Sequence, residues 1–178
     1  VSSDVLIPRD DTEVLVDQAL DKAVKYQQPK IVDLGTGSAI VAIVLAKRCP
    51  DAVVTATDVS QAALGIARKN AARHSATVRF LEGDWYAPLG EDRFDLIVSN
   101  PPYVVDGDPH LARNGLPFEP QTALTDGVAD GDGLACIRTI IDGAPAHLSP
   151  GGWLLMEHGY VQAVKVRDLL AAAGFSEV

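Results

Sequence analysis

The stretch FDLIVSNPPY, residues 94–103, decides how the rest of the chain can be arranged. Its first half is mostly apolar, which is typical of a strand buried inside a parallel sheet. Two consecutive prolines cannot continue such a strand, because neither donates a backbone hydrogen bond to a neighbouring strand. The chain therefore leaves the sheet at Asn100, so the Asn100 amide, the rigid carbonyls of the two prolines and the Tyr103 ring stand at the carboxyl end of a strand. Ligands of open α/β sheets bind at this end of the strands. The alternative is a purely structural role, in which the prolines end the strand and Tyr103 packs beneath a loop.

A glycine-rich loop follows an earlier apolar run, residues 30–34, and precedes a helical stretch that begins at Ala39. The loop reads Gly-Thr-Gly-Ser over residues 35–38. A strand followed by Gly-x-Gly and a helix brings backbone N–H groups and a helix N-terminus close to a ligand. Asp58 ends the next apolar run, about 20 positions after the glycines, where a carboxylate can accept hydrogen bonds from both hydroxyls of a ribose. Together these residues predict a nucleoside-binding site.

The pattern favours S-adenosylmethionine (AdoMet) over a dinucleotide. A dinucleotide fingerprint requires a third glycine where this chain has Ile40, which argues against a bound pyrophosphate. AdoMet carries no phosphate, so the loop needs only to pass close to a ribose and an amino-acid tail. After a further apolar run, residues 78–82, Asp84 and Trp85 are positioned to contact the adenine amine and the adenine ring. Packing of Trp85 in the core is the alternative.

Apolar runs and helical periods alternate along the chain, which predicts an α/β fold with a doubly wound parallel sheet. Ser60 is expected to cap a helix that runs to about residue 74. Asp10 is expected to cap a helix of about fourteen residues, with Glu13 completing a capping box. The remaining expected elements are a fourth strand over 94–98, a fifth over 153–157, and helices over 134–145 and 164–173.

Residues 104–133 show no sustained period. A loop of this length in a compact domain is typically a binding loop or a lid. If the first and fourth strands are neighbours, the glycine loop and the Asn-Pro-Pro-Tyr motif face each other across a single crevice.

The composition is that of an ordinary globular domain, with 178 residues of which 47% are apolar and 22% charged. The net charge of −9 argues against a nucleic-acid partner, because proteins that bind a nucleic-acid backbone usually present a basic face. No apolar run approaches the roughly 20 residues that span a bilayer, so we expect a cytoplasmic protein without membrane contact. Cys49 and Cys136 lack the close partner of a redox or zinc motif and the histidines are scattered, so we expect reduced cysteines and no metal.

These motifs together resemble the peptide chain release factor glutamine N(5)-methyltransferases, which are class I AdoMet-dependent methyltransferases. The resemblance spans nearly the whole chain. It rests on LIPR (6–9) with TE (12–13), DLGTGS (33–38), NPPY (100–103), FEP (118–120) with AL (123–124), and EHG (157–159). NPPY alone is shared with amino-methyltransferases of adenine, guanine and ribosomal RNA, whereas LIPR and EHG are much more specific. The resemblance implies a Rossmann-like fold with strand order 3-2-1-4-5, helices on both faces, and residues 1–178 as the catalytic domain.

The chain departs from the family pattern at three points. Ala39 stands where the family usually has glycine, so its Cβ is expected to crowd the cofactor. Asp10 stands where the family often has proline. The family also has an N-terminal helical domain that helps to grip the release factor, and further strands that close the sheet after residue 178. We expect this chain to lack both.

The resemblance implies methyl transfer from AdoMet to the side-chain amide of the glutamine in the Gly-Gly-Gln motif of release factors. The Asn100 side-chain oxygen and the Pro101 carbonyl are suited to accept the two N–H bonds of this amide, while Tyr103 covers its plane. In-line transfer then needs position and orientation rather than a strong base. We expect substrate contacts from Asn100, Pro101, Pro102 and Tyr103, and AdoMet contacts from Gly35, Thr36, Gly37, Ser38, Ala39, Asp58, Asp84, Trp85 and Asn100.

Two other functions remain open at the level of the sequence. An exocyclic adenine amine is as planar and as weakly nucleophilic as an amide, so the same site chemistry suits an amino-methyltransferase of nucleic acid. A non-catalytic AdoMet-binding fragment is the third reading. Charge and the flanking motifs favour the protein substrate.

Overall fold

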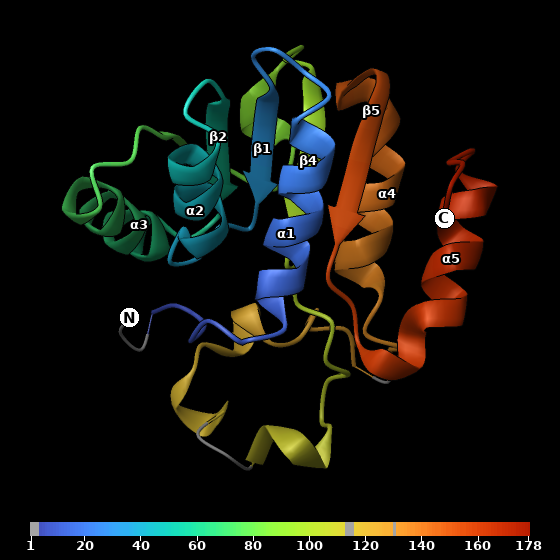
Figure 1. Cartoon of the computed structure of the whole chain (residues 1–178). Helices are drawn as coiled ribbons and strands as arrows, with labels where there is room; N and C mark the ends of the chain where they lie inside the picture. The colour runs from blue at the N-terminus through green and yellow to red at the C-terminus, as the bar shows by residue number, and fades with distance from the viewer. Residues whose placement is uncertain (1–3, 113–115, 130) are drawn as a thin grey trace.

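The computed structural model describes residues 4–112, 116–129 and 131–178. Its centre is a five-stranded sheet with the order β3-β2-β1-β4-β5, and every pair of neighbouring strands is parallel (Figure 1). The predicted doubly wound sheet and its strand order are confirmed. The strands are β1 (Lys30–Leu34), β2 (Val53–Asp58), β3 (Arg79–Glu82), β4 (Phe94–Ser99) and β5 (Leu148–Met156).

Helices cover both faces of the sheet (Figure 1). The helices α1, α2 and α3 and one face of the sheet pack together in a single apolar cluster. On the other face α4 packs against the sheet, and α5 packs beside α4 in a cluster that also includes side chains of β5. None of the helices in the described ranges is long and apolar enough to cross a membrane. Their bounds are α1 (Thr12–Ala23), α2 (Ile40–Arg48), α3 (Gln61–Arg73), α4 (Ala135–His147) and α5 (Ala163–Ala172), with 3₁₀ turns η1 (Ala87–Leu89), η2 (Pro109–Ala112), η3 (Leu116–Phe118), η4 (Gln121–Ala123) and η5 (Tyr160–Gln162).

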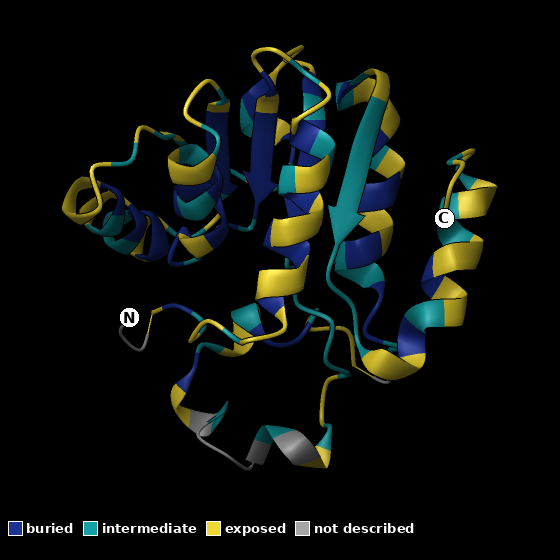
Figure 2. Cartoon of the chain, in the orientation of Figure 1, coloured by how far each residue is buried: buried dark blue, intermediate teal, exposed yellow. Residues whose placement is uncertain are grey.

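The central strands are mostly apolar because both of their faces are covered. Along β4, Leu96 and Val98 pack beneath α1 to α3, whereas Ile97 packs on the opposite side with α4. The edge strand β5 is only half-buried along most of its length (Figure 2). The continuous apolar runs in the sequence therefore identify the interior strands of a parallel sheet.

The register of the sheet brings the predicted motifs to one edge. Leu34 pairs with Thr57 on one side and with Ser99 on the other. The glycine loop, Asp58 and Asn100 therefore leave the sheet at the same level from three adjacent strands. The prediction that the first and fourth strands are neighbours is confirmed.

The structure tests four local predictions about the ends of helices. The predicted capping box is wrong, because α1 starts at Thr12, its N-cap Asp11 makes no side-chain capping bond, and the Glu13 N–H donates instead to the backbone carbonyl of Asp10. The same helix has 12 residues and ends at Ala23, earlier than expected. The Ser60 cap is confirmed, since its Oγ accepts the Ala63 N–H at 3.2 Å. The fourth helix continues past Pro145 to His147, and β5 begins directly afterwards at Leu148.

Candidate active site

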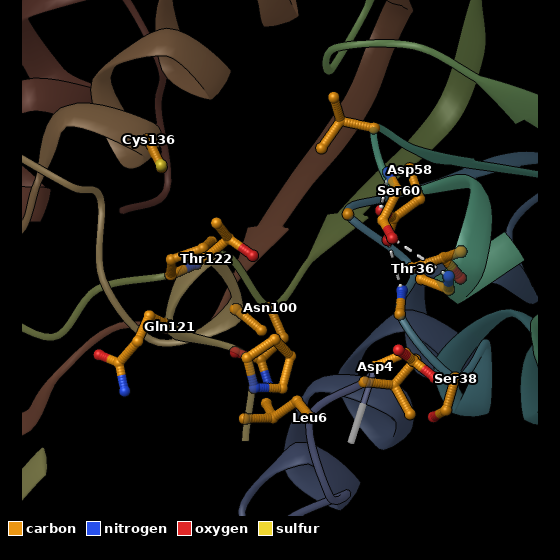
Figure 3. Close-up of a pocket in the computed structure, with 18 of the residues that line it drawn as sticks. Asp4, Leu6, Thr36, Ser38, Asp58, Ser60, Asn100, Gln121, Thr122 and Cys136 are labelled. Carbon is orange, nitrogen blue, oxygen red and sulfur yellow. Dashed lines mark hydrogen bonds between the residues drawn. The ribbon is translucent and has the colours of Figure 1, made fainter. Parts of the chain in front are cut away.

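A cavity of about 700 Å³ opens at the carboxyl edge of the sheet (Figure 3). Its walls come from the N-terminal segment, from the loops after β1, β2, β3 and β4, and from the long segment before α4. Figure 3 shows Asp58 and Ser60 on one side, Thr122 and Cys136 across the hollow, and Asn100 beside Leu6 between them. The lining of the cavity includes Thr12, Asp33, Gly35, Thr36, Gly37, Ser38, Asp58, Asp84, Trp85, Asn100 and Pro102.

The loop after β1 turns because its glycines adopt left-handed backbone conformations. Gly35 has φ 68° and Gly37 has φ 54°. A Cβ on Gly35 would stand 3.2 Å from Cζ3 of Trp85, whereas a Cβ on Gly37 would meet no atom within 4 Å. The first glycine therefore allows the indole to approach the loop, and the second leaves open space in a wall of the cavity.

Asp58 is fixed by two backbone groups. The Gly37 N–H donates to its Oδ2 at 2.8 Å, and the Ser60 N–H donates to its Oδ1 at 2.8 Å (Figure 3). Each carboxylate oxygen has a further lone pair, so the held carboxylate can still accept two hydroxyl hydrogen bonds. The held carboxylate therefore keeps acceptor capacity for a ligand in the cavity.

Asp33 is a functional candidate to which the sequence analysis gave no role. It lies within β1, is 2% exposed, and accepts the Thr36 Oγ1 hydroxyl at 2.5 Å. Burial raises the pKa of Asp33 to about 7, against the hydrogen bonds from Thr36 and from the Ala42 backbone, which lower it. A carboxylate in the middle of an apolar strand was the available signal, because such a group is rarely buried without a function.

The Ala39 side chain lies in the core and not in the cavity, where its Cβ was expected to crowd the cofactor. Ala39 adopts a left-handed conformation with φ 64°, is fully buried in the core cluster beneath α2, and is not among the residues that line the cavity. The glycine preference of the family at this position therefore has a conformational explanation. The Cβ of Ala39 packs in the core and not in the cavity.

Asp84 and Trp85, the two residues expected to contact adenine, both line the cavity. Trp85 also packs against the apolar cluster beneath α4, and the Thr57 hydroxyl donates to its backbone carbonyl at 3.1 Å. Its backbone has φ 43°, a conformation that β3 and the following turn impose on a bulky residue. The two readings of Trp85 are thus compatible: part of the side chain packs in the core and part forms a cavity wall.

The Asn-Pro-Pro-Tyr motif is divided between the cavity and the protein interior. Asn100 and Pro102 line the cavity, whereas Pro101 and Tyr103 are not among the residues that do so. The Tyr103 hydroxyl donates to Glu157 Oε1 at 2.9 Å, and its ring packs against the cluster between α4 and α5. Tyr103 therefore anchors the loop in this structure.

The Asn100 side chain makes a hydrogen bond to a residue that is distant in the sequence. Its Nδ2 donates to the Thr12 hydroxyl at 3.2 Å, and that hydroxyl donates to Glu157 Oε2 at 2.9 Å. The sequence analysis quoted Thr12 and Glu157 only as parts of family motifs. Their presence in the two most specific of those motifs was the signal that they matter.

Glu119, in the FEP motif of the long loop, contacts the LIPR motif of the N-terminal segment. Its side chain is 4% exposed, pairs with Arg9, and accepts the Ile7 N–H at 2.9 Å. The N-terminal segment and the segment over 116–127 are thereby held together, and both contribute walls to the cavity. The prediction that the long region forms part of a binding site agrees with this position.

Of the two cysteines, Cys136 lines the cavity and Cys49 does not. Cys49 and Cys136 are both free thiols, as expected. In the part of the chain that the structure describes, no three His, Cys, Asp or Glu side chains are grouped as a metal site.

Comparison with known proteins identifies close relatives. Residues 10–114 match the family model "Methyltransferase small domain". The release factor glutamine methyltransferase of Bordetella pertussis is 53% identical over 179 residues, which cover 100% of this chain and 65% of that protein. The corresponding protein of Burkholderia pseudomallei is 52% identical over 185 residues, which cover 100% of this chain and 64% of that protein. This chain thus spans a little under two thirds of the length of these relatives.

Solved structures show the same architecture. A ribosomal protein methylase from Lactobacillus delbrueckii subsp. bulgaricus superposes with a TM-score of 0.67 at 22% identity, and the alignment covers 94% of this chain and 71% of that one. At this level of identity the likeness shows the fold.

Proposed function

The chain belongs to the methyltransferase small domain family, and we propose that it transfers a methyl group from AdoMet to the side-chain amide of a glutamine in peptide chain release factors. Relatives at 53% and 52% identity are release factor glutamine methyltransferases, which supports this substrate. The observation that carries the proposal is that one cavity is lined by both the Asp58 carboxylate and the Asn100 amide. Residues 1–178 are then the catalytic domain.

The lining of the cavity supplies groups suited to the parts of AdoMet. When bound, AdoMet supplies an activated methyl group on a positively charged sulfonium. Asp58 would hold the ribose, since each of its oxygens keeps a lone pair after accepting its backbone N–H. Gly37 leaves open space beside it, and Trp85 offers a flat wall for the adenine. The carboxylates of Asp58 and Asp84 favour a cationic ligand.

Asn100 is the residue that we assign to the substrate amide. Its side-chain oxygen would accept one N–H of the glutamine side chain and so fix the nitrogen that receives the methyl group. We assign the second N–H to the Pro101 carbonyl, which would accept it. Pro101 adjoins Pro102, which lines the cavity, and the proline ring restricts the position of the carbonyl. Transfer then depends on holding nitrogen and methyl in line, and the methylated amide releases its proton to water.

A competition assay tests the proposal. The chain is given labelled AdoMet together with a purified release factor and an adenine-containing oligonucleotide, and mass spectrometry locates the added methyl group. The expected product carries the label on the glutamine of the Gly-Gly-Gln motif. Label on the oligonucleotide would show a nucleic-acid enzyme, and AdoMet binding without transfer to either would show a non-catalytic fragment.

Two variants test the assigned roles. Asn100→Ala is expected to lower turnover on the order of 100-fold while AdoMet affinity changes little, because the residue acts on the acceptor amide. Asp58→Ala is expected to weaken AdoMet binding more than it lowers saturated turnover. Asp51→Ala removes an exposed carboxylate outside the cavity and serves as the control. An unchanged rate in Asn100→Ala would refute its assignment.

A further inference from the structure

A row of hydrogen bonds connects the carboxyl end of β5 to the cavity. Glu157, just after β5, accepts the Thr12 hydroxyl at Oε2 over 2.9 Å, and Thr12 Oγ1 accepts from Asn100 Nδ2 over 3.2 Å. Thr12 is buried, and Asn100 and Glu157 are half-buried. Glu157 is not among the residues that line the cavity, so it can act on a ligand there only through its neighbours.

Glu157 is held at both carboxylate oxygens. The Tyr103 hydroxyl donates to Oε1 at 2.9 Å, and the Glu157 backbone N–H donates to the Ser99 carbonyl at 3.0 Å. Burial, together with the adjacent Glu157 carboxylate, raises the pKa of Tyr103 well above its usual range, so this hydroxyl keeps its proton and donates. With both oxygens engaged as acceptors, Glu157 is a fixed acceptor for Thr12.

Which group donates and which accepts in this row of hydrogen bonds follows from counting the hydrogens available. A threonine hydroxyl carries one hydrogen, and here it is donated to Glu157, which leaves only lone pairs on Thr12 Oγ1. The group facing those lone pairs must be a donor, so Asn100 turns its NH₂ toward Thr12. Its Oδ1 then faces away from Thr12, and among the described residues no group donates to that oxygen.

We propose that Glu157 and Thr12 are positioning residues that set the orientation of the Asn100 amide, so that the cavity receives a hydrogen-bond acceptor. Without the carboxylate, the Thr12 hydrogen becomes free to bond Asn100 Oδ1, and the amide can turn its NH₂ into the cavity. A donor there would face the N–H groups of a substrate amide and repel them. This inference deepens the proposed function and rests on it for the substrate, whereas the orientation of Asn100 is a property of the chain alone.

The orientation is tested first without any substrate. In NMR spectra of the labelled chain, nuclear Overhauser effects from the Asn100 side-chain NH₂ to the Thr12 side chain are expected. In Glu157→Ala these effects are expected to weaken as the amide turns. Absence of the effects in the unmodified chain, or their persistence in Glu157→Ala, would overturn the proposal whichever substrate the chain methylates.

The second test is kinetic and uses the acceptor that is methylated in the competition assay. Glu157→Ala and Thr12→Val are each expected to lower kcat on the order of 10-fold to 100-fold, with the AdoMet dissociation constant within about threefold. Thr12→Ser, which keeps the hydroxyl, is expected to recover most of the lost turnover. Glu91→Ala, an exposed carboxylate at a distance from the cavity, is the control.

The double variant distinguishes a Glu157 that acts on Asn100 through Thr12 from two residues whose loss damages the structure independently. If Glu157 acts through Thr12, combining Glu157→Ala with Thr12→Val is expected to lower kcat no further than the worse single variant, because both substitutions break the same row of hydrogen bonds. A loss of kcat in the double variant equal to the product of the two single losses would overturn the proposal. A Thr12→Ser variant with kcat as low as that of Thr12→Val would also overturn it. If Thr12→Val does not fold, as judged by its AdoMet affinity and urea midpoint, Glu157→Ala with Thr12→Ser decides the question alone.

Discussion

The two glycines of the loop after β1 should respond differently to the same substitution. Gly35→Ala and Gly37→Ala both force an L-residue into a left-handed conformation, at φ 68° and φ 54°, which costs about 1–2 kcal/mol. At Gly35 the added Cβ would also stand 3.2 Å from the Trp85 ring, and displacing a packed side chain adds about 1 kcal/mol or more. We therefore expect Gly35→Ala to lose about 2–4 kcal/mol of unfolding free energy and Gly37→Ala about 1–2 kcal/mol.

Ligand binding should show the opposite order. The Cβ at Gly37 meets no protein atom within 4 Å and lies in a wall of the cavity, so it takes space from AdoMet rather than from the core. We expect the AdoMet dissociation constant of Gly37→Ala to rise on the order of 10-fold, which corresponds to a clash of about 1.4 kcal/mol. Gly35→Ala should affect affinity less, through a moved Trp85.

The measurements are urea unfolding followed by circular dichroism, and isothermal titration with AdoMet. Gly174→Ala is the control, because Gly174 has φ 87°, open space around it and a position at the end of α5 outside the cavity. It should lose about as much stability as Gly37→Ala and keep full affinity. Equal stability losses in Gly35→Ala and Gly37→Ala would refute the claim that Trp85 restricts the first glycine.

Three further predictions follow from single contacts. Glu119→Ala breaks the pairing with Arg9 and is expected to lower the unfolding free energy by about 2 kcal/mol, less than a fully buried pair because Arg9 is 36% exposed; an unchanged urea midpoint would contradict it. Ser60→Ala should cost about 1 kcal/mol by removing the N-cap bond to Ala63, also measured by urea unfolding. Asp33, with a pKa raised to about 7, binds a proton in the folded state that the unfolded state has released, so between about pH 4 and pH 7 stability should fall as pH rises, by about 1.4 kcal/mol per unit. The slope is taken as the difference between the unmodified chain and Asp33→Asn, and a flat difference would contradict the raised pKa.

Much of the fold could be predicted because its signals are local. The apolar run before Asn100 identifies an interior strand, and Ser60 identifies a helix start, from residues a few positions apart. Asp10 misled the sequence analysis because a capping box depends on backbone geometry, and the chain begins the helix with backbone turn bonds instead. The position of the Ala39 Cβ could not be predicted for the same kind of reason, since its left-handed backbone directs the Cβ into the core.

The sequence by itself determined the class of fold, the order in which its strands and helices occur, and the chemical identity of Asp58 and Asn100 at strand ends. Only the tertiary structure decided what those groups face. Thr12 and Glu157 are 145 positions apart, Arg9 and Glu119 are 110 apart, and Asn100 is 88 positions from Thr12, yet each pair is in hydrogen-bond contact. Such pairs carry no periodicity, because a hydrogen bond depends on where the packed sheet brings two atoms. The residues that could bind AdoMet are thus readable along the chain, whereas the orientation of the Asn100 amide is set by side chains that meet only after the sheet has formed.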